Sequence, residues 1–395
     1  MSRSYDIFRI AADYPVGGKP SYGLQPNFYY LSKEQVRIGN RVKIIARRIG
    51  SEPSLENDGN VEIHRLENPF NVNAYRLITR MKENNGRSLI HTHSTSGFFL
   101  SMAKSPLGLP VFSHVHGASR SKRMPQKLKG VEDQDFSSSK MWYYYFRERL
   151  FWSLANRVLA VSTCLKQDLI DYYNLNGSRI DVVYNGVDTR LFHRVSSEVP
   201  EPLKKFEGKK IVLYVGHFGP RKGLIFLIRA LPEIALTVPD AVVVAVGGVP
   251  AWLGKNKYWA YLKNEIAKRG MEEKIFLLDR VPNEMLPAYY SNANVFVLPS
   301  FYEAFAKVVL EAMACECPVV ITREGGPQEA IDEGKSGFLI DYASESQLAT
   351  AVSSILRDEG KAREMGVKAR ERILKDFTWE AVARRVNLAY GEILP

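Results

Sequence analysis

Two glutamates stand eight positions apart in the segment PSFYEAFAKVVLE, residues 299–311. Glu311 lies in an otherwise largely apolar run with the spacing of a helix, and Glu303 lies just before that run begins. The residues leave two interpretations open. Glu311 and Lys307, four positions apart, can pair on an exposed helix face, with Glu303 as a favourable charge at the helix N-terminus. Alternatively, both carboxylates lie in a crevice and accept hydrogen bonds from paired hydroxyl groups.

The segment GHFGPRKG, residues 216–223, joins a short apolar strand to an amphipathic helix. Its glycines permit a tight turn and a close approach by a ligand, and Lys222 stands at the start of the helix. Unpaired backbone N–H groups and the helix dipole both favour an anion there. The pattern predicts a phosphate site, although ordinary turns share this composition and the GxxxxGK[ST] loop is absent.

A second glycine-bearing turn, PVGGKPS at residues 15–21, follows the weaker strand YDIFRIAADY. It lacks the GxGxxG spacing of a dinucleotide site. The turn is either an ordinary connection or a flexible loop in which the backbone N–H groups of Gly17 and Gly18 bind an anion.

Two pairs of histidines stand at the ends of predicted strands, His91 with His93 and His114 with His116. Residues two apart on a strand share a face, so either pair has the geometry to bind a metal. A metal site normally needs three or four ligands, and no carboxylate or cysteine lies at a suitable local spacing. We therefore expect no metal site and favour a polar contact with a substrate.

The segments that position these loops alternate short β-rich runs with longer helical patterns, which is typical of parallel sheets covered by helices on both faces. Strands are predicted in the first half at 42–47, 88–94, 110–117, 157–162 and 181–186. Strands are predicted in the second half at 211–218, 241–248, 274–281, 295–300, 318–324 and 337–341. The fold class is therefore α/β, with two doubly wound Rossmann-like domains whose ligands bind beyond the carboxyl ends of the strands.

The polar, proline-bearing segment at residues 196–210 is the expected join between the two domains. It gives an N-terminal domain of residues 1–195 and a C-terminal domain of residues 196–377. The last amphipathic helix, about 378–395, has a pattern that suits packing on either domain.

Positive charge is concentrated in the N-terminal half. Residues 1–195 carry 28 Lys and Arg against 17 Asp and Glu, which is +11, whereas the remainder carries 26 against 26. The segment ASRSKRMPQKLKG, residues 118–130, contains five cations and no acidic residue: Arg120, Lys122, Arg123, Lys127 and Lys129. This excess suits an anionic membrane face, a phosphorylated acceptor or a solvated surface. The charge is diffuse and no nucleic-acid motif appears, so we expect no nucleic-acid partner.

The three cysteines, Cys164, Cys315 and Cys317, have no CxxC spacing, which favours a reducing compartment without disulfides. The first residues lack the long apolar centre of a secretory signal. The longest apolar region, 224–248, is interrupted by charges and prolines and cannot span a bilayer. We expect a cytoplasmic protein that is either soluble or bound peripherally to the inner face of a membrane.

The run PSFYEAFAKVVLEAMACECPVVITREGGPQEAI resembles the signature of nucleotide-sugar-dependent family 4 glycosyltransferases, in which two glutamates flank seven residues. The resemblance continues in YNGVD, GHFGPRKG, VGG, FLLDRV and PVGG, and covers nearly the whole chain. It implies the GT-B fold, with an acceptor-binding and a donor-binding domain facing a central cleft. It also implies retaining hexosyl transfer from a UDP or GDP sugar to a glycan or lipid-linked hydroxyl, with no metal and no cofactor besides that co-substrate.

The resemblance assigns roles in donor binding to residues of the C-terminal half. By that resemblance, Glu311 binds the ribose hydroxyls. Glu303 and the backbone amides of Phe305 and Ala306 hold the donor sugar, and Val281 of FLLDRV belongs to the same donor site.

The resemblance also implies which residues are catalytic. Lys222 binds the diphosphate, and the loop with Gly17 and Gly18 closes on it. A histidine such as His116 lies beside the transferred sugar. Lys222, Glu303 and His116 are therefore the expected catalytic residues.

One departure concerns the diphosphate. The family usually has an arginine after the first glycine of the GHFGPRKG segment, where this chain has His217. Arg221, next to Lys222, is the alternative source of that charge, so His217 and Arg221 join the candidate donor residues. Two other functions stay open: a catalytically weak nucleotide-sugar-binding protein, and a glycoside hydrolase that uses Glu303 and Glu311 as acid and nucleophile.

Overall fold

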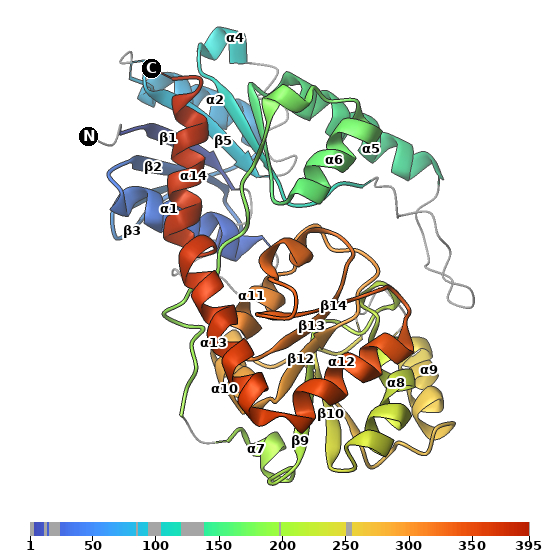
Figure 1. Cartoon of the computed structure of the whole chain (residues 1–395). Helices are drawn as coiled ribbons and strands as arrows, with labels where there is room; N and C mark the ends of the chain where they lie inside the picture. The colour runs from blue at the N-terminus through green and yellow to red at the C-terminus, as the bar shows by residue number, and fades with distance from the viewer. Residues whose placement is uncertain are drawn as a thin grey trace. The chain divides into compact units, whose positions relative to one another are not determined.

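The computed structural model describes residues 4–11, 14–15, 24–83, 86–93, 104–119, 138–196, 199–249 and 255–394 (Figure 1). The described residues form two compact units. The first unit contains the chain up to Gly186 together with the C-terminal segment from Trp379, and the second contains residues 187–378. Each unit is built on its own largely parallel sheet, as the sequence predicts.

The sheet of the first unit has the strand order β3-β4-β2-β1-β5-β6-β7-β8. All neighbouring strands are parallel except β3 and β4, which are antiparallel. The strands are β1 (Asp6–Ile10), β2 (Arg41–Arg47), β3 (Leu55–Asp58), β4 (Val61–Leu66), β5 (Ser88–His93), β6 (Val111–Val115), β7 (Arg157–Ala160) and β8 (Ile180–Val182). The helices are α1 (Gln25–Arg37), α2 (Phe70–Met81), α4 (Lys104–Leu107), α5 (Ser138–Leu154), α6 (Thr163–Tyr173) and α14 (Trp379–Gly391).

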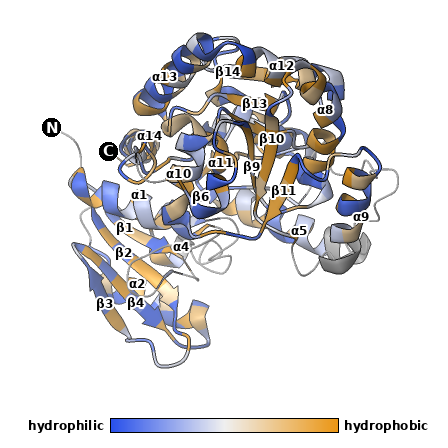
Figure 2. Ribbon diagram, turned by 90° about the horizontal axis from the view of Figure 1, so that it is seen from below, coloured by the Kyte–Doolittle hydropathy of each residue, from blue (hydrophilic) through white to orange (hydrophobic). Residues whose placement is uncertain are grey.

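The sheet of the second unit has the order β11-β10-β9-β12-β13-β14 and is parallel throughout. Its strands are β9 (Lys210–Val215), β10 (Ala241–Val246), β11 (Ile275–Leu278), β12 (Val295–Leu298), β13 (Val319–Thr322) and β14 (Gly337–Ile340). Its helices are α7 (Glu201–Lys204), α8 (Leu224–Thr237), α9 (Lys255–Ala267), α10 (Leu286–Asn292), α11 (Lys307–Ala314), α12 (Glu345–Arg357) and α13 (Glu359–Asp376). The central strands are orange in Figure 2 because strands covered on both faces are apolar along their whole length.

The division between the units differs from the predicted join at 196–210, and falls after Gly186. The reason is packing by the residues that follow. The Val187 amide donates to the Phe377 carbonyl (2.9 Å), and the Val195 amide donates to Ser291 Oγ (3.0 Å). Residues 187–195 therefore belong to the second unit, and the polar segment at 196–210 lies within it.

The C-terminal helix α14 packs in the first unit, against α1. Trp379 begins this helix, and its ring lies against the Gly186 backbone, where a Cβ atom would come within 2.6 Å of the indole. The Tyr5 and Tyr390 rings also meet edge to face at 5.5 Å. The pattern at 378–395 suited either domain, and buried aromatic contacts favour the N-terminal one.

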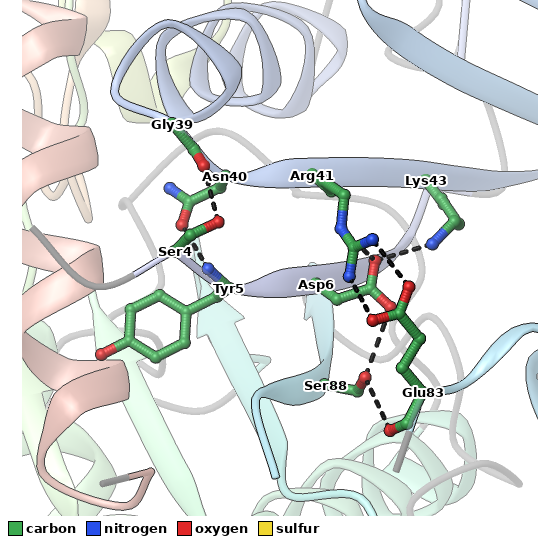
Figure 3. A network of polar contacts seen from close by, with 9 residues as sticks. All are labelled: Ser4, Tyr5, Asp6, Gly39, Asn40, Arg41, Lys43, Glu83 and Ser88. Atoms are coloured by element: carbon green, nitrogen blue, oxygen red, sulfur yellow. Dashed lines mark hydrogen bonds and ion pairs between the residues drawn. The ribbon is translucent and has the colours of Figure 1, made fainter. Parts of the chain in front are cut away.

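A polar network ties β1, β2 and β5 together at their amino ends (Figure 3). The buried Asp6 carboxylate forms an ion pair with Lys43 (2.7 Å) and accepts a hydrogen bond from Ser88 Oγ (3.3 Å). Asn40 Oδ1 accepts a hydrogen bond from the Tyr5 amide (2.9 Å). Because ligands bind at the opposite, carboxyl edge of such sheets, we assign this buried charge a role in stability.

Candidate functional site

The GHFGPRKG loop and the PSFYEAF loop meet at the carboxyl edge of the second sheet, after β9 and β12. Gly223 has φ 74° and lies so close to the second loop that an added Cβ atom would stand 1.9 Å from the Pro299 carbonyl oxygen. The Phe301 amide donates a hydrogen bond to the Arg221 carbonyl oxygen (2.8 Å). Only glycine fits at position 223, since both this backbone conformation and this contact exclude a side chain.

The loop after β13 fixes the PSFYEAF loop from its other side. Thr322 Oγ1 donates to the Ser300 carbonyl oxygen (2.6 Å), and the Gly326 amide donates to the Glu303 carbonyl oxygen (2.9 Å). Gly325, with φ 81°, would place a Cβ atom 2.0 Å from that same Glu303 oxygen. The backbone of Glu303 is therefore held before any ligand arrives.

Lys222 and Glu303, predicted to lie in one site, form a largely buried ion pair with 2.7 Å between Nζ and Oε1. Burial opposes ionisation of Glu303, but the cations of Lys222 and Arg221 outweigh it and hold the pKa of this carboxyl below its usual range. The pair places a negative hydroxyl acceptor and a positive phosphate-binding group side by side.

His217 is part of the same cluster, but it carries no charge at neutral pH. Burial and the cations Lys222 and Arg221 lower the pKa of His217 to about 4. The buried Tyr214 hydroxyl lies 3.2 Å from the His217 carbonyl oxygen and 3.5 Å from the Lys222 carbonyl oxygen. It therefore contacts the backbone at both ends of the turn. The Arg221 side chain is exposed. Positive charge at this turn therefore comes from Lys222 inside and Arg221 at the surface.

Glu311 lies on α11 and is half-buried, as is Lys307. The buried Tyr290 hydroxyl donates a hydrogen bond to Glu311 Oε2 (3.2 Å). Burial raises the pKa of Glu311, against the opposing effects of Lys307 and of Tyr290. Burial also lowers the pKa of Lys307 to about 8. Lys307 and Glu311 therefore do not form the exposed ion pair that was one of the two interpretations of the sequence.

The remaining predicted donor residues of the second unit lie at the same edge of the sheet. Phe305 and Ala306 are buried and lead directly into α11, and the Phe305 ring stacks on Phe377 at 6.0 Å. Val281 follows β11 and is partly exposed. No hydrogen bond within the described residues explains a special role for Val281, and its assignment remains a prediction.

His116 lies in the first unit, just beyond β6, and both of its ring nitrogens have partners. Asn27 Nδ2 contacts His116 Nδ1 (2.8 Å) and donates to Asn185 Oδ1 (3.2 Å). His93 Nδ1 and His116 Nε2 are 2.9 Å apart. His116 Nδ1 also lies 3.1 Å from Asn185 Oδ1, so this nitrogen faces both an amide donor and an amide acceptor. A substrate hydroxyl reaches a ring nitrogen of His116 only by replacing Asn27, Asn185 or His93.

The histidines of β5 and β6 form a stack of rings beneath α1 and α14. One ring nitrogen from each of His91, His93 and His114 lies within 4.8 Å of the others, so these three side chains are candidate metal ligands. The His93 and His114 rings are nearly parallel, with 25° between their planes and 5.5 Å between their centroids. Buried Arg9 also adds positive charge that lowers the pKa values of all three, after burial itself. The positive charge of Arg9 opposes a bound cation, and the expectation that no metal binds stays a prediction.

Several predicted residues lie outside the described part of the chain. These are Gly17 and Gly18 of the N-terminal loop, and the five cations of residues 118–130: Arg120, Lys122, Arg123, Lys127 and Lys129. Their proposed contacts remain predictions.

Sequence reasoning missed the side chains that hold the site residues. Tyr290 contacts Glu311, Tyr214 spans the phosphate loop, and Asn27 with Asn185 contacts His116. Asn185 alone had a signal, because it belongs to the YNGVD segment of the family resemblance.

Comparison with known families matches both halves of the chain. The model described as "Glycosyl transferases group 1" matches residues 195–372, and that described as "Glycosyltransferase Family 4" matches residues 23–191. Alpha-maltose-1-phosphate synthase of Mycolicibacterium smegmatis is 32% identical over 259 residues, which are 62% of this chain and 65% of the relative. Spore coat protein SA of Bacillus subtilis is 30% identical over 59% of this chain and 64% of the relative. The matched stretches thus span less than two thirds of either relative.

Solved structures resemble the whole chain. Sucrose-phosphate synthase from Thermosynechococcus elongatus has a TM-score of 0.78 and 22% identity, covering 98% of this chain and 99% of the other. Anabaena HepE in complex with UDP-glucose has a TM-score of 0.73 and 18% identity, with the same coverage of 98% and 99%. At such identities the likeness concerns the fold. Together with the two matching families, it shows that this chain belongs to the family 4 glycosyltransferases and has their GT-B fold.

Proposed function

We propose that this protein transfers a sugar from a nucleoside-diphosphate sugar to an acceptor hydroxyl, with retention of the anomeric configuration. The observation that carries the proposal is the buried Lys222–Glu303 ion pair beside a glycine turn that a side chain cannot enter. The family supports sugar transfer, and a neighbour of the same fold has been solved with UDP-glucose. The nucleotide of the donor is proposed to be UDP or GDP.

The donor is proposed to lie along the carboxyl edge of the second sheet. Glu311, oriented by Tyr290, accepts hydrogen bonds from the ribose hydroxyls, and Phe305 and Ala306 present backbone amides to the sugar. Lys222 shifts part of its contact from Glu303 to the diphosphate, and Glu303 then accepts hydrogen bonds from sugar hydroxyls. Gly17 and Gly18 are proposed to add N–H donors.

Charge develops on the departing diphosphate as the glycosidic bond breaks. Lys222 stabilises that charge from a position already fixed by the loop, so little reorganisation is needed during reaction. Arg221 adds a weaker, exposed charge, whereas neutral His217 adds none at neutral pH. These groups take the place of a divalent metal in the proposed reaction, and activity is expected to persist in EDTA.

Retention is proposed to follow from displacement on one face of the sugar, with a leaving-group phosphate oxygen accepting the acceptor proton. Glu303 is tied to Lys222 and is not assigned as a nucleophile. His116 is proposed to lie beside the transferred sugar, where a donor hydroxyl replaces Asn27 as its partner.

The acceptor is proposed to be a glycan or a lipid-linked hydroxyl at an anionic membrane face. The support is the charge of +11 over residues 1–195 and the five cations of residues 118–130. No described helix is long and apolar enough to cross a membrane. Sedimentation with anionic and neutral vesicles, for wild type and for a variant with these five cations replaced by glutamine, tests this part. Equal binding to both vesicle types contradicts it.

Product analysis tests the transfer itself. Donor sugars are incubated with the protein and membrane lipid extract, with and without EDTA, and the anomeric configuration of the product is read by proton NMR. A simple glycoside without nucleotide is included, because the raised pKa of Glu311 and the lowered pKa of Glu303 are also typical of a hydrolase acid and nucleophile, with the two roles exchanged relative to the sequence-based alternative. Release of nucleoside diphosphate with an α-linked product from an α-linked donor supports the proposal. Cleavage of the nucleotide-free glycoside instead contradicts it.

A further inference from the structure

Helix α5 of the first unit exposes five large apolar side chains: Tyr144, which is 37% exposed, and four others that lie along one side of the helix. Trp142, Tyr143, Phe146 and Leu150 are 48%, 62%, 56% and 49% exposed. Positions 142, 146 and 150 lie on successive turns of the helix, with 143 beside them, and the Trp142 and Phe146 rings stack at 5.6 Å. We call these four residues the aromatic face. A contiguous exposed apolar face of this kind marks an interaction site more often than scattered apolar residues do.

The opposite side of α5 is anchored, so the aromatic face is held outward. Buried Tyr145 and Trp152 pack on the Tyr173 ring of α6, at 5.1 and 4.9 Å. Glu148 accepts hydrogen bonds from the Tyr173 hydroxyl (2.6 Å) and from Ser119 Oγ (2.7 Å). The helix therefore cannot rotate to bury its exposed aromatic rings without breaking these contacts.

The charge around the aromatic face is positive. Arg147 and Arg149 are the charged residues of the described part of α5 besides a single acid, Glu148, which is turned inward. The Arg147 guanidinium lies 5.9 Å from the centre of the Tyr143 ring. Helix α5 is largely pale in Figure 2, because the hydropathy scale ranks tryptophan and tyrosine as weakly polar, so its apolar area is understated there.

We infer that the aromatic face of α5 docks on an anionic lipid bilayer. Tryptophan and tyrosine prefer the headgroup level of a membrane, phenylalanine and leucine favour the acyl boundary, and neighbouring cations attract anionic lipids. A second copy of this chain is a poorer occupant, because two such basic surfaces repel each other. The inference deepens, and rests on, the membrane-facing acceptor of the proposed function, and it names the surface that makes contact.

Vesicle sedimentation tests the surface. The variant Trp142→Gln, Phe146→Gln, Leu150→Gln is compared with a matched control, Leu236→Gln, Leu374→Gln, Leu388→Gln, whose residues are 85%, 49% and 72% exposed elsewhere. On phosphatidylglycerol-containing vesicles, we expect the aromatic-face variant to lose at least about tenfold in partition coefficient. The control variant keeps wild-type binding. If the triple variant unfolds, Phe146→Gln alone is expected to lose about threefold in the same measurement.

Each outcome separates this inference from the donor chemistry. Vesicle binding by the folded aromatic-face variant equal to that of wild type overturns the inference while leaving the sugar-transfer proposal intact. No vesicle binding by wild type overturns both this surface and the membrane-facing acceptor. A third outcome is that wild type forms a dimer and binds no vesicles, and that the aromatic-face variant is a monomer. This result identifies a second copy as the occupant of the aromatic face and also overturns the inference. Nucleoside-diphosphate binding by the same variants is expected to equal that of wild type. If wild type binds no nucleoside diphosphate, the proposed function is contradicted, whatever the vesicle result.

Discussion

Gly223 and the Pro299 carbonyl oxygen are in direct contact, so close that a Cβ atom on Gly223 would stand 1.9 Å from that oxygen. This contact joins the turn that carries Lys222 to the loop that carries Glu303. The distance between the proposed phosphate-binding lysine and the proposed sugar-binding carboxylate is thus set by backbone against backbone, which is stiffer than contact between side chains.

Gly223→Ala is expected to destabilise the second unit by at least about 2 kcal/mol, because the added methyl group collides with the Pro299 backbone. Gly208→Ala is the matched control: Gly208 has the same φ of 74°, but nothing lies within 4 Å of its Cβ position. It should cost only the backbone strain of about 1 kcal/mol. Urea unfolding measures both, and equal losses would show that the Pro299 contact is unimportant.

Glu311→Ala is expected to weaken nucleoside-diphosphate binding by about 1–3 kcal/mol, because a charged acceptor for the ribose hydroxyls is lost. Tyr290→Phe is the companion variant. It removes only the hydrogen bond that orients Glu311 and should weaken binding by less than about 1 kcal/mol. Calorimetric titration measures both affinities. Unchanged affinity in a folded Glu311→Ala protein would remove Glu311 from the donor site.

The cations of the phosphate turn should differ in importance. Lys222→Ala is expected to reduce turnover most, Arg221→Ala less and His217→Ala least, because Lys222 is largely buried and paired with Glu303, Arg221 is exposed and His217 is neutral. His217→Arg should tighten donor binding by supplying the arginine that the family usually has. Steady-state kinetics at pH 7 tests the order. Full activity of Lys222→Ala would show that the diphosphate is bound elsewhere.

The histidine stack should make the first unit sensitive to acid. Burial lowers the pKa of His114 to about 3, and lowers those of His91 and His93 as well. The unfolded chain therefore binds protons more readily than the folded one below about pH 6.5, so this stability is present above that pH and is lost as the pH falls. His114 alone should cost on the order of 2 kcal/mol by pH 5.

The measurement is urea unfolding at a series of pH values between about 7 and 5, compared with the variant His114→Gln. The variant should show a shallower dependence on pH over this range. An identical pH dependence in both proteins would mean that His114 is charged in the folded protein.

The sequence predicts the strands that lead to the site because each is a compact apolar run. The β3–β4 pair was missed because β3 is short, polar and largely exposed, with the sequence LEND. The division of the two packed units after Gly186 was not predicted, for a different reason. The contacts of Val187 with Phe377, and of Val195 with Ser291, join residues far apart in the chain and leave no local pattern.

The candidate site shows the same limit. The spacing of Glu303 and Glu311, and the glycines around Lys222, are local features, so the sequence displays them. The partners that fix those residues come from elsewhere: Tyr290 for Glu311 and Asn27 for His116. Hydrogen bonds between distant segments depend on tertiary packing, which neither periodicity nor composition encodes.

Thermal unfolding against a panel of nucleoside diphosphates and nucleotide sugars tests the central claim most directly, because it requires no knowledge of the acceptor. A ligand at about 100 times its dissociation constant adds roughly 2.7 kcal/mol, which raises the melting temperature of a unit of this size by about 5–10 °C. We expect such a shift with the nucleoside diphosphate of one base and with the nucleotide sugar of the same base. The shift should be smaller in the Lys222→Ala protein. The absence of any shift across the panel at millimolar concentration would contradict the account.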